Sequence, residues 1–315
     1  MFFKKKDPFF YGKSDLKDPF FSKLFYCPHP FTNWSLNPLS KNNKNELMHT
    51  IEGFRKTSKV NSIKEELSDH EGVCQIYCLG GSTTYCDGLY DYRDSWPFKL
   101  RELINKNSKN LLINAGVGGW STIQSLIRYS TWGALIKPKI TIFYQAKNDL
   151  TPLFNGRSCE KKLFPLLENV MLQLDTSFNS NPRLYKKNND GLASVYTKQI
   201  LADPDGLNRF DDEWKYLYEV RCNTIAQIAS QWGGKIYFIP ELYSSDTSYF
   251  KALTEMHLIM EKVAKKNANS EFFDLRKTFE FNKKDFLDKC HFSKSGTTRF
   301  SNFLFEKLVN EVISN

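Results

Sequence analysis

The sequence contains no Cys-x-x-Cys pair and no long apolar run. Its seven cysteines are spread singly along the chain, which argues against a zinc ribbon and weakly favours a reducing compartment. No stretch reaches the roughly 18 consecutive apolar residues of a membrane-spanning helix. Charges and prolines interrupt residues 1–21 before any apolar core develops, so we expect no signal peptide. These absences predict a cytoplasmic protein without a transmembrane segment.

Long basic runs are also missing, although the formal net charge is +9 and the pI is about 9.0. Lys4–Lys6 is the longest such run, and many other lysines lie in polar segments such as 105–110 and 186–191. A positive balance can favour nucleic acid, a membrane surface or an acidic glycan. Scattered lysines are more typical of a solvated surface, and no nucleic-acid-binding motif is present. We therefore expect no nucleic-acid partner.

From residue 73 onward, short apolar segments alternate with amphipathic ones. This alternation predicts an α/β fold in which helices cover both faces of a five-stranded parallel sheet. The predicted strands are 73–79, 110–116, 139–146, 235–242 and 271–275, and the predicted helices are 95–107, 121–136, 213–232, 247–267 and 295–313.

Two segments depart from this alternation. Residues 1–70 are rich in Phe, Pro, Asn and Lys, and we expect them to form an extended lead-in of turns and edge pieces packed on the main domain, 71–315. The interval 151–211 contains one helix-like piece, 159–174, followed by a polar tract. A long insertion of this kind is usually a lid, a substrate wall or a mobile loop.

Polar loops follow the predicted strands, at the edge of the sheet where ligands of such folds bind. A P-loop is excluded because the first of these loops has no lysine. A dinucleotide fingerprint is disfavoured because Ser121 stands where its third glycine belongs and the later acidic residue is missing. The four loops are Gly80–Thr84, Asn114–Trp120, Lys147–Asp149 and Asp288–Ser293.

A serine nucleophile in the first loop would need a base for its proton and donors for the oxyanion. His291 lies in a loop just before the last predicted helix, and Asp288 can orient its imidazole from the same loop. The other histidines are less suitable, because His29, His49 and His70 precede the first strand of the sheet and His257 lies inside a predicted helix.

Two candidates can supply oxyanion donors. The backbone N–H of Gly119 lies at a helix start, where donors are unpaired, and Asn148 adds a side-chain amide. Taken singly, Gly118-Gly119 is compatible with a plain helix-entry turn and Asn148-Asp149 with an Asx turn. The order Ser, Gly, Asn, His in four loops at matching positions favours a catalytic site instead.

This order resembles the SGNH (GDSL-type) hydrolase superfamily over about residues 72–313. The usual GDS block is matched by Gly80-Gly81-Ser82, with glycine in place of aspartate. The GxND block is matched by Ala146–Asp149, with alanine in place of glycine. The remaining blocks are NxxxxG, matched by Asn114–Gly119, and DxxH, matched by Asp288–His291. Neither departure removes a catalytic group.

The resemblance implies a single flavodoxin-like domain with three α/β/α layers. It also implies a triad of Ser82 as nucleophile, His291 as base and Asp288 as its orienting acid. The oxyanion hole would consist of the backbone N–H groups of Ser82 and Gly119 and the amide of Asn148. No metal or other cofactor is implied, and the substrate-binding residues stay unknown.

The lead-in narrows the resemblance. Its segments His29-Pro30-Phe31, Leu36-Asn37-Pro38 and Gly53-Phe54-Arg55 resemble a subset of bacterial SGNH proteins associated with surface-polysaccharide modification. We therefore expect hydrolysis of a small-molecule or glycan ester, with an O-acetyl or other short O-acyl group as the first candidate. Transfer of the acyl group to an alcohol or sugar and a non-catalytic binding or assembly protein are the alternatives.

Overall fold

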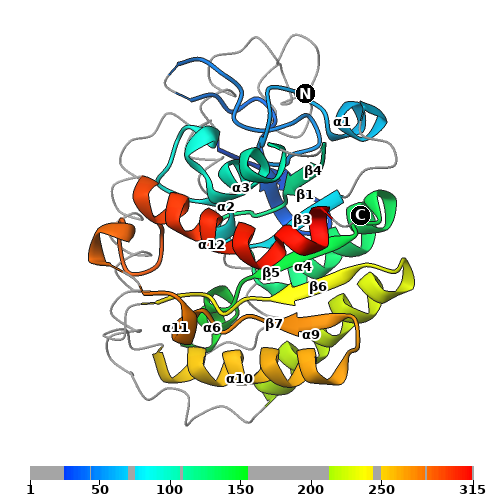
Figure 1. Cartoon of the computed structure of the whole chain (residues 1–315), viewed down its shortest axis with the longest axis vertical. Coiled ribbons are helices and arrows are strands. Elements are labelled where there is room, and N and C mark those ends of the chain that lie inside the picture. Colours follow the sequence, from blue (N-terminus) through cyan, green and yellow to red (C-terminus); the bar gives the residue numbers. More distant parts are fainter. Residues whose placement is uncertain are drawn as a thin grey trace, which may run out of the picture.

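The computed structural model describes residues 25–42, 44–69, 75–106, 109–154, 213–243, 250–280 and 282–313. They form three layers, with a parallel sheet between two sets of helices (Figure 1). The sheet order is β4-β3-β5-β6-β7 with every pair parallel, which is the flavodoxin-like order. The predicted fold is therefore confirmed. The strands are β3 (Gln75–Gly80), β4 (Leu111–Asn114), β5 (Ile140–Tyr144), β6 (Lys235–Phe238) and β7 (Ser270–Phe272).

The alternation of side chains along β3 shows how the layers are held together. Ile76 and Cys78 enter the hydrophobic cluster on one face of the sheet, and Tyr77 and Leu79 enter the cluster on the other. All four side chains are fully buried. A central parallel strand covered on both faces has this near-continuous apolar pattern.

Helices on the two faces match the predicted ones to within a few residues. On one face lie α3 (Trp96–Ile104) and α12 (Lys294–Ile313), and on the other lie α4 (Thr122–Arg128), α9 (Glu213–Gln231) and α10 (Phe250–Lys266). The predicted helix 121–136 is interrupted by a π-helical turn, Tyr129–Gly133, before α5 (Ala134–Ile136) ends it. None of the helices in these ranges has both the length and the apolar character needed to cross a membrane.

Several short elements were not predicted. The first loop of the site contains a helical turn, α2 (Ser82–Tyr85), and α6 (Lys147–Phe154) starts directly after β5. The insertion 151–211 and its helix-like piece 159–174 lie almost entirely outside the described residues. The remaining elements are the antiparallel hairpin β1 (Tyr26–His29) and β2 (Asn33–Leu36), α1 (Ile63–Asp69), α11 (Leu275–Thr278) and the 3-10 turns Tyr92–Asp94 and Lys283–Asp285.

The Gly53-Phe54-Arg55 segment joins the lead-in to the sheet. The backbone N–H of Arg55 donates to the Asn114 carbonyl at the end of β4 (3.2 Å). Its buried guanidinium lies 4.1 Å from the ring centre of Tyr85 in α2 and donates to the Leu89 carbonyl. Phe54, fully buried, packs beneath the guanidinium of Arg128 at 3.8 Å. The described part of the lead-in therefore touches the same loops that carry the predicted site.

His49 in the lead-in is a buried neutral histidine with both ring nitrogens engaged. Nδ1 donates to the Asn37 carbonyl (2.7 Å), and Nε2 accepts from the Tyr85 hydroxyl (2.8 Å). Burial lowers the pKa of His49 to about 3, and it does the same to the pKa of His257 in α10. His49 is therefore a structural link between the lead-in and α2. His257 is a buried residue of α10, as expected.

These two histidines predict a loss of stability in acid. The folded pKa lies below the unfolded value, so the stabilisation is complete above about pH 6.5 and is lost as the pH falls towards 3. At pH 5.0, 1.5 units below the ordinary histidine pKa of 6.5, the loss is about 2 kcal/mol per histidine. Urea titrations at pH 7.5 and 5.0 should show a drop of about 4 kcal/mol in the free energy of unfolding. His49→Gln should show roughly half that drop, and an equal drop in both proteins would contradict the role of His49.

Candidate active site

Ser82 and His291 meet at the carboxyl edge of the sheet. Ser82 is the first residue of α2, directly after β3, and His291 lies three residues before α12. The Ser82 Oγ is 2.8 Å from Nε2 of His291, although 209 positions separate them in the sequence. Both side chains are half-buried, so solvent and substrate can reach the pair.

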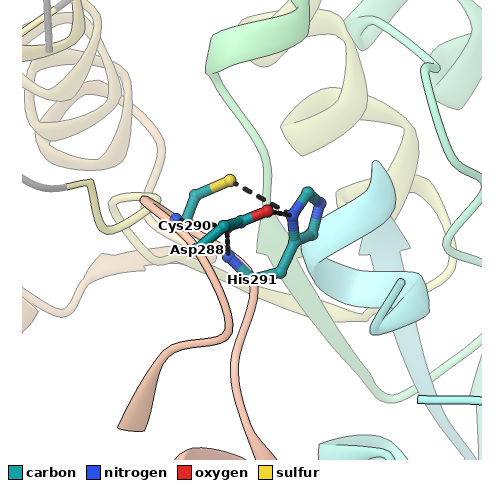
Figure 2. Close-up of side chains that lie close together, drawn as sticks. All are labelled: Asp288, Cys290 and His291. Atoms are coloured by element: carbon teal, nitrogen blue, oxygen red, sulfur yellow. Dashed lines mark hydrogen bonds and ion pairs between the residues drawn. The ribbon is translucent and has the colours of Figure 1, made fainter. Parts of the chain in front are cut away.

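Asp288 holds the ring of His291 from the other side. Its Oδ2 lies 2.7 Å from Nδ1, and its Oδ1 accepts the backbone N–H groups of Cys290 (2.9 Å) and His291 (2.8 Å). Figure 2 shows the carboxylate directed at the ring within a single tight loop. Partial burial alone would raise the pKa of Asp288, but the hydrogen bonds from His291 and Cys290 outweigh it and lower the pKa to about 2. Asp288 is therefore a carboxylate at any pH near neutrality.

These contacts determine the tautomer of His291. An ionised carboxylate only accepts hydrogen bonds, so Nδ1 carries the proton and Nε2 presents its lone pair to the Ser82 hydroxyl. A hydroxyl, an imidazole and a carboxylate arranged in this order can pass a proton from the hydroxyl to the ring.

The neighbour of His291 anchors the loop in the core. Phe292 is 1% exposed and packs against Phe300 of α12 at a ring-centre distance of 5.1 Å. The backbone of the loop closes with a bond from the Leu287 N–H to the His291 carbonyl (2.7 Å). His291 thus projects from a rigid turn towards the end of β3.

The loops that carry the predicted oxyanion donors lie beside the loop of Ser82. The Asn148 side-chain nitrogen donates to the Trp120 carbonyl (2.9 Å), which sets the direction of the amide. A Cβ on Gly81 would come within 2.7 Å of that nitrogen, so Asn148 lies directly against the residue before Ser82. Gly119 has a φ of 76°, a backbone conformation that favours glycine. The structure therefore brings together the loops of Ser82, Gly119 and Asn148.

Two other motif residues connect the loops rather than face the serine. Asn114 accepts from the Gly116 N–H (3.0 Å) and donates to the Thr84 carbonyl (3.1 Å), which links β4 to α2. Asp149 accepts from the backbone N–H and the hydroxyl of Thr122 (2.9 and 2.8 Å), which links α6 to α4. Both side chains are buried, and they explain why the motifs extend beyond the reacting groups.

Glu241 is a buried residue of the site that the sequence patterns did not identify. It follows β6 and is 5% exposed. One carboxylate oxygen accepts from the Thr83 hydroxyl (2.8 Å), and the other accepts from the backbone N–H groups of Ala146 (2.8 Å) and Lys147 (2.7 Å). Glu241 therefore joins α2 to the turn that carries Asn148. In the sequence it falls inside the predicted strand 235–242, so no pattern marked it as part of the site.

One group of described side chains has the spacing of a metal site. Ligand atoms of Asp288, Cys290 and His291 lie within 4.8 Å of one another, and the sulfur is 3.5 Å from Nδ1 (Figure 2). Metals bind the thiolate, but burial raises the pKa of the Cys290 thiol strongly. The same Nδ1 is also engaged by Asp288. The cluster fits a proton relay better than a metal centre.

Comparisons with known proteins give structural similarity only. No family model matches the chain, and no curated protein matches it. A lipase/acylhydrolase from Enterococcus faecalis is 14% identical with a TM-score of 0.48, covering 76% of this chain and 97% of that one. An acetylxylan esterase from Geobacillus stearothermophilus is 10% identical with a TM-score of 0.47, covering 75% and 94%. The functional conclusion therefore depends on the site itself.

Proposed function

We propose that this chain is an SGNH-type serine hydrolase that cleaves an ester through an acyl-enzyme on Ser82. The observation that carries the proposal is the continuous chain of contacts from Ser82 Oγ to His291 Nε2 and from Nδ1 to Asp288, at 2.8 and 2.7 Å. The distance from nucleophile to base is within direct proton-transfer reach.

The reaction follows from these roles. His291 removes the proton of Ser82 as Oγ attacks the ester carbonyl, and Asp288 stabilises the imidazolium that forms. The backbone N–H groups of Ser82 and Gly119 and the Asn148 amide receive the oxyanion. His291 then protonates the departing alcohol, which leaves the acyl group on Ser82. Water, deprotonated by His291, releases the acid and restores the serine. These groups supply base, nucleophile and donors without a cofactor.

For the substrate we propose a short O-acyl ester, with an O-acetylated carbohydrate as the first to try. Support comes from the lead-in, whose segments resemble those of polysaccharide-associated SGNH proteins. Its described residues also contact α2 and the end of β4.

A fluorophosphonate probe tests the nucleophile directly. We expect one probe adduct on wild-type protein, located at Ser82 by peptide mass spectrometry, and none on Ser82→Ala. Ser293→Ala is the matched control, because it removes a serine from the loop of His291 whose hydroxyl bonds the Lys284 carbonyl instead. Equal labelling of wild type and Ser82→Ala would exclude Ser82 as the nucleophile and so reject the proposal. Wild type that neither labels nor hydrolyses short esters would favour a binding protein instead.

The same preparation separates hydrolysis from transfer. Free acid released from a p-nitrophenyl acetate substrate is measured with and without a sugar acceptor. We expect its rate to be undiminished by the acceptor, whereas acyl transfer to the sugar at the expense of free acid would identify a transferase.

A further inference from the structure

Gly118 and Gly119 share one peptide plane that determines where an oxyanion donor points. The turn Val117–Trp120 is closed by a bond from the Trp120 N–H to the Val117 carbonyl (3.2 Å), and Gly119 at its third position has φ 76°. Because the φ of Gly118 is not positive, the positive φ of Gly119 marks a type II turn rather than a type I′ turn. Its central peptide joins the Gly118 carbonyl to the Gly119 N–H, and in a trans peptide these groups point in opposite directions.

Trp34 of the lead-in holds this peptide by its carbonyl end. Its indole N–H donates to the Gly118 carbonyl (3.1 Å), and the indole N–H of Trp120 donates back to the Trp34 carbonyl (3.0 Å). Trp34 is 3% exposed, and a Cβ at Gly119 would lie 3.3 Å from its ring. The tryptophan therefore packs on the turn and bonds to it at two points.

The other hydrogen bonds of the described residues to this turn hold its ends. The side chains of Asn148 and Gln145 both donate to the Trp120 carbonyl (2.9 and 2.6 Å), and the Val117 N–H donates to the Gly80 carbonyl (3.2 Å). Two adjacent glycines allow the central peptide to adopt either turn type, because neither carries a Cβ that selects one. Among the hydrogen bonds of the described residues, the indole of Trp34 is the partner that selects the orientation.

We propose that Trp34 is a positioning residue that aims the Gly119 N–H at the oxyanion, so that the lead-in completes the active site. This inference rests on the proposed function. Without the indole N–H, the buried Gly118 carbonyl loses its donor, and rotation of the peptide relieves that loss by turning the Gly119 N–H away. The effect falls on the transition state and leaves binding of the ester ground state unchanged.

The test compares two Trp→Phe variants at the same junction. Trp132 also packs between the lead-in and the main domain, with its ring centre 5.3 Å from that of Phe54. Within the described residues, no hydrogen bond connects Trp132 to the Gly118-Gly119 turn. We expect Trp34→Phe to lower kcat for p-nitrophenyl acetate about tenfold with KM unchanged. This loss is smaller than the roughly 100-fold or greater loss that follows complete removal of an oxyanion donor. Trp132→Phe should change kcat less than about twofold.

A second substitution isolates the N–H if Trp34→Phe does not fold. Benzothienylalanine at position 34 keeps the shape of the ring and replaces the N–H by sulfur, and we expect the same loss of kcat. Equal kcat in wild type and this variant, or equal losses in the two Trp→Phe variants, would overturn the inference while leaving the hydrolase intact. Wild type without esterase activity or probe labelling would instead overturn the proposed function, and the role of Trp34 with it.

Discussion

Replacing His291 with alanine is expected to lower kcat by a factor between about 10⁴ and 10⁶, with little change in KM. The imidazole is the group whose Nε2 lies 2.8 Å from Ser82 Oγ. Without it the serine hydroxyl keeps its proton and is a weak nucleophile. The variant should retain its fold, because the ring is half-buried and the neighbouring Phe292 keeps the loop in the core.

The matched control is Cys290→Ala, measured on the same ester. The sulfur is 3.5 Å from Nδ1 of His291 but lies outside the path of the proton. A serine relay predicts that this variant keeps kcat within about threefold of wild type. A metal centre built from Asp288, Cys290 and His291 predicts that it falls as far as His291→Ala. Comparable losses in the two variants would therefore reject the relay.

The fold was predictable because its strands are short, apolar and separated by amphipathic helices. β3 carries buried side chains on both faces, which only a central parallel strand requires. The boundaries were less predictable. The predicted strand 139–146 extends beyond the end of β5 at Tyr144. The strand ends there because Gln145 and Ala146 form hydrogen bonds with Trp120 and Glu241 instead.

The meeting of the candidate reacting groups was predictable for a different reason. A nucleophile, a base and oxyanion donors have to be particular residue types, and a parallel sheet gathers its strand ends at one edge. Ser82 and His291 are therefore recognisable 209 positions apart. Taken singly, each of the four loops was compatible with an ordinary turn. The order Ser, Gly, Asn, His and the common edge of the sheet together favoured a catalytic site.

The supporting groups left no comparable signal. Glu241 acts through three hydrogen bonds to two other loops, and one glutamate after a strand does not reveal its partners. Trp34 lies in the lead-in, which shows no periodic pattern, and it donates to the carbonyl of Gly118, 84 positions away. A bond to a backbone carbonyl places no demand on the partner's side chain, so nothing in the sequence marks the pair. Long-range bonds of this kind emerge only from the folded chain.

Replacing Asp288 with asparagine is expected to lower kcat by about 10⁴-fold while leaving the loop in place. The amide oxygen can still accept the N–H groups of Cys290 and His291, as Oδ1 does now. The amide nitrogen, however, replaces the oxygen that faces Nδ1 at 2.7 Å. Two donors then oppose each other, so the ring moves its proton to Nε2 and can no longer accept from Ser82.

Rates on p-nitrophenyl acetate between pH 5 and 9 test this, with Asp94→Asn as the control. Asp94 pairs with Lys294 at the start of α12 (2.7 Å), so its removal changes charge near the loop without touching His291. The wild-type profile should show no limb from Asp288 in this range, because its pKa of about 2 keeps it ionised. If Asp288 acted only as nearby negative charge, both variants would lose activity alike. A loss of activity confined to Asp288→Asn, with an unchanged melting temperature, would show that the carboxylate controls the tautomer of His291.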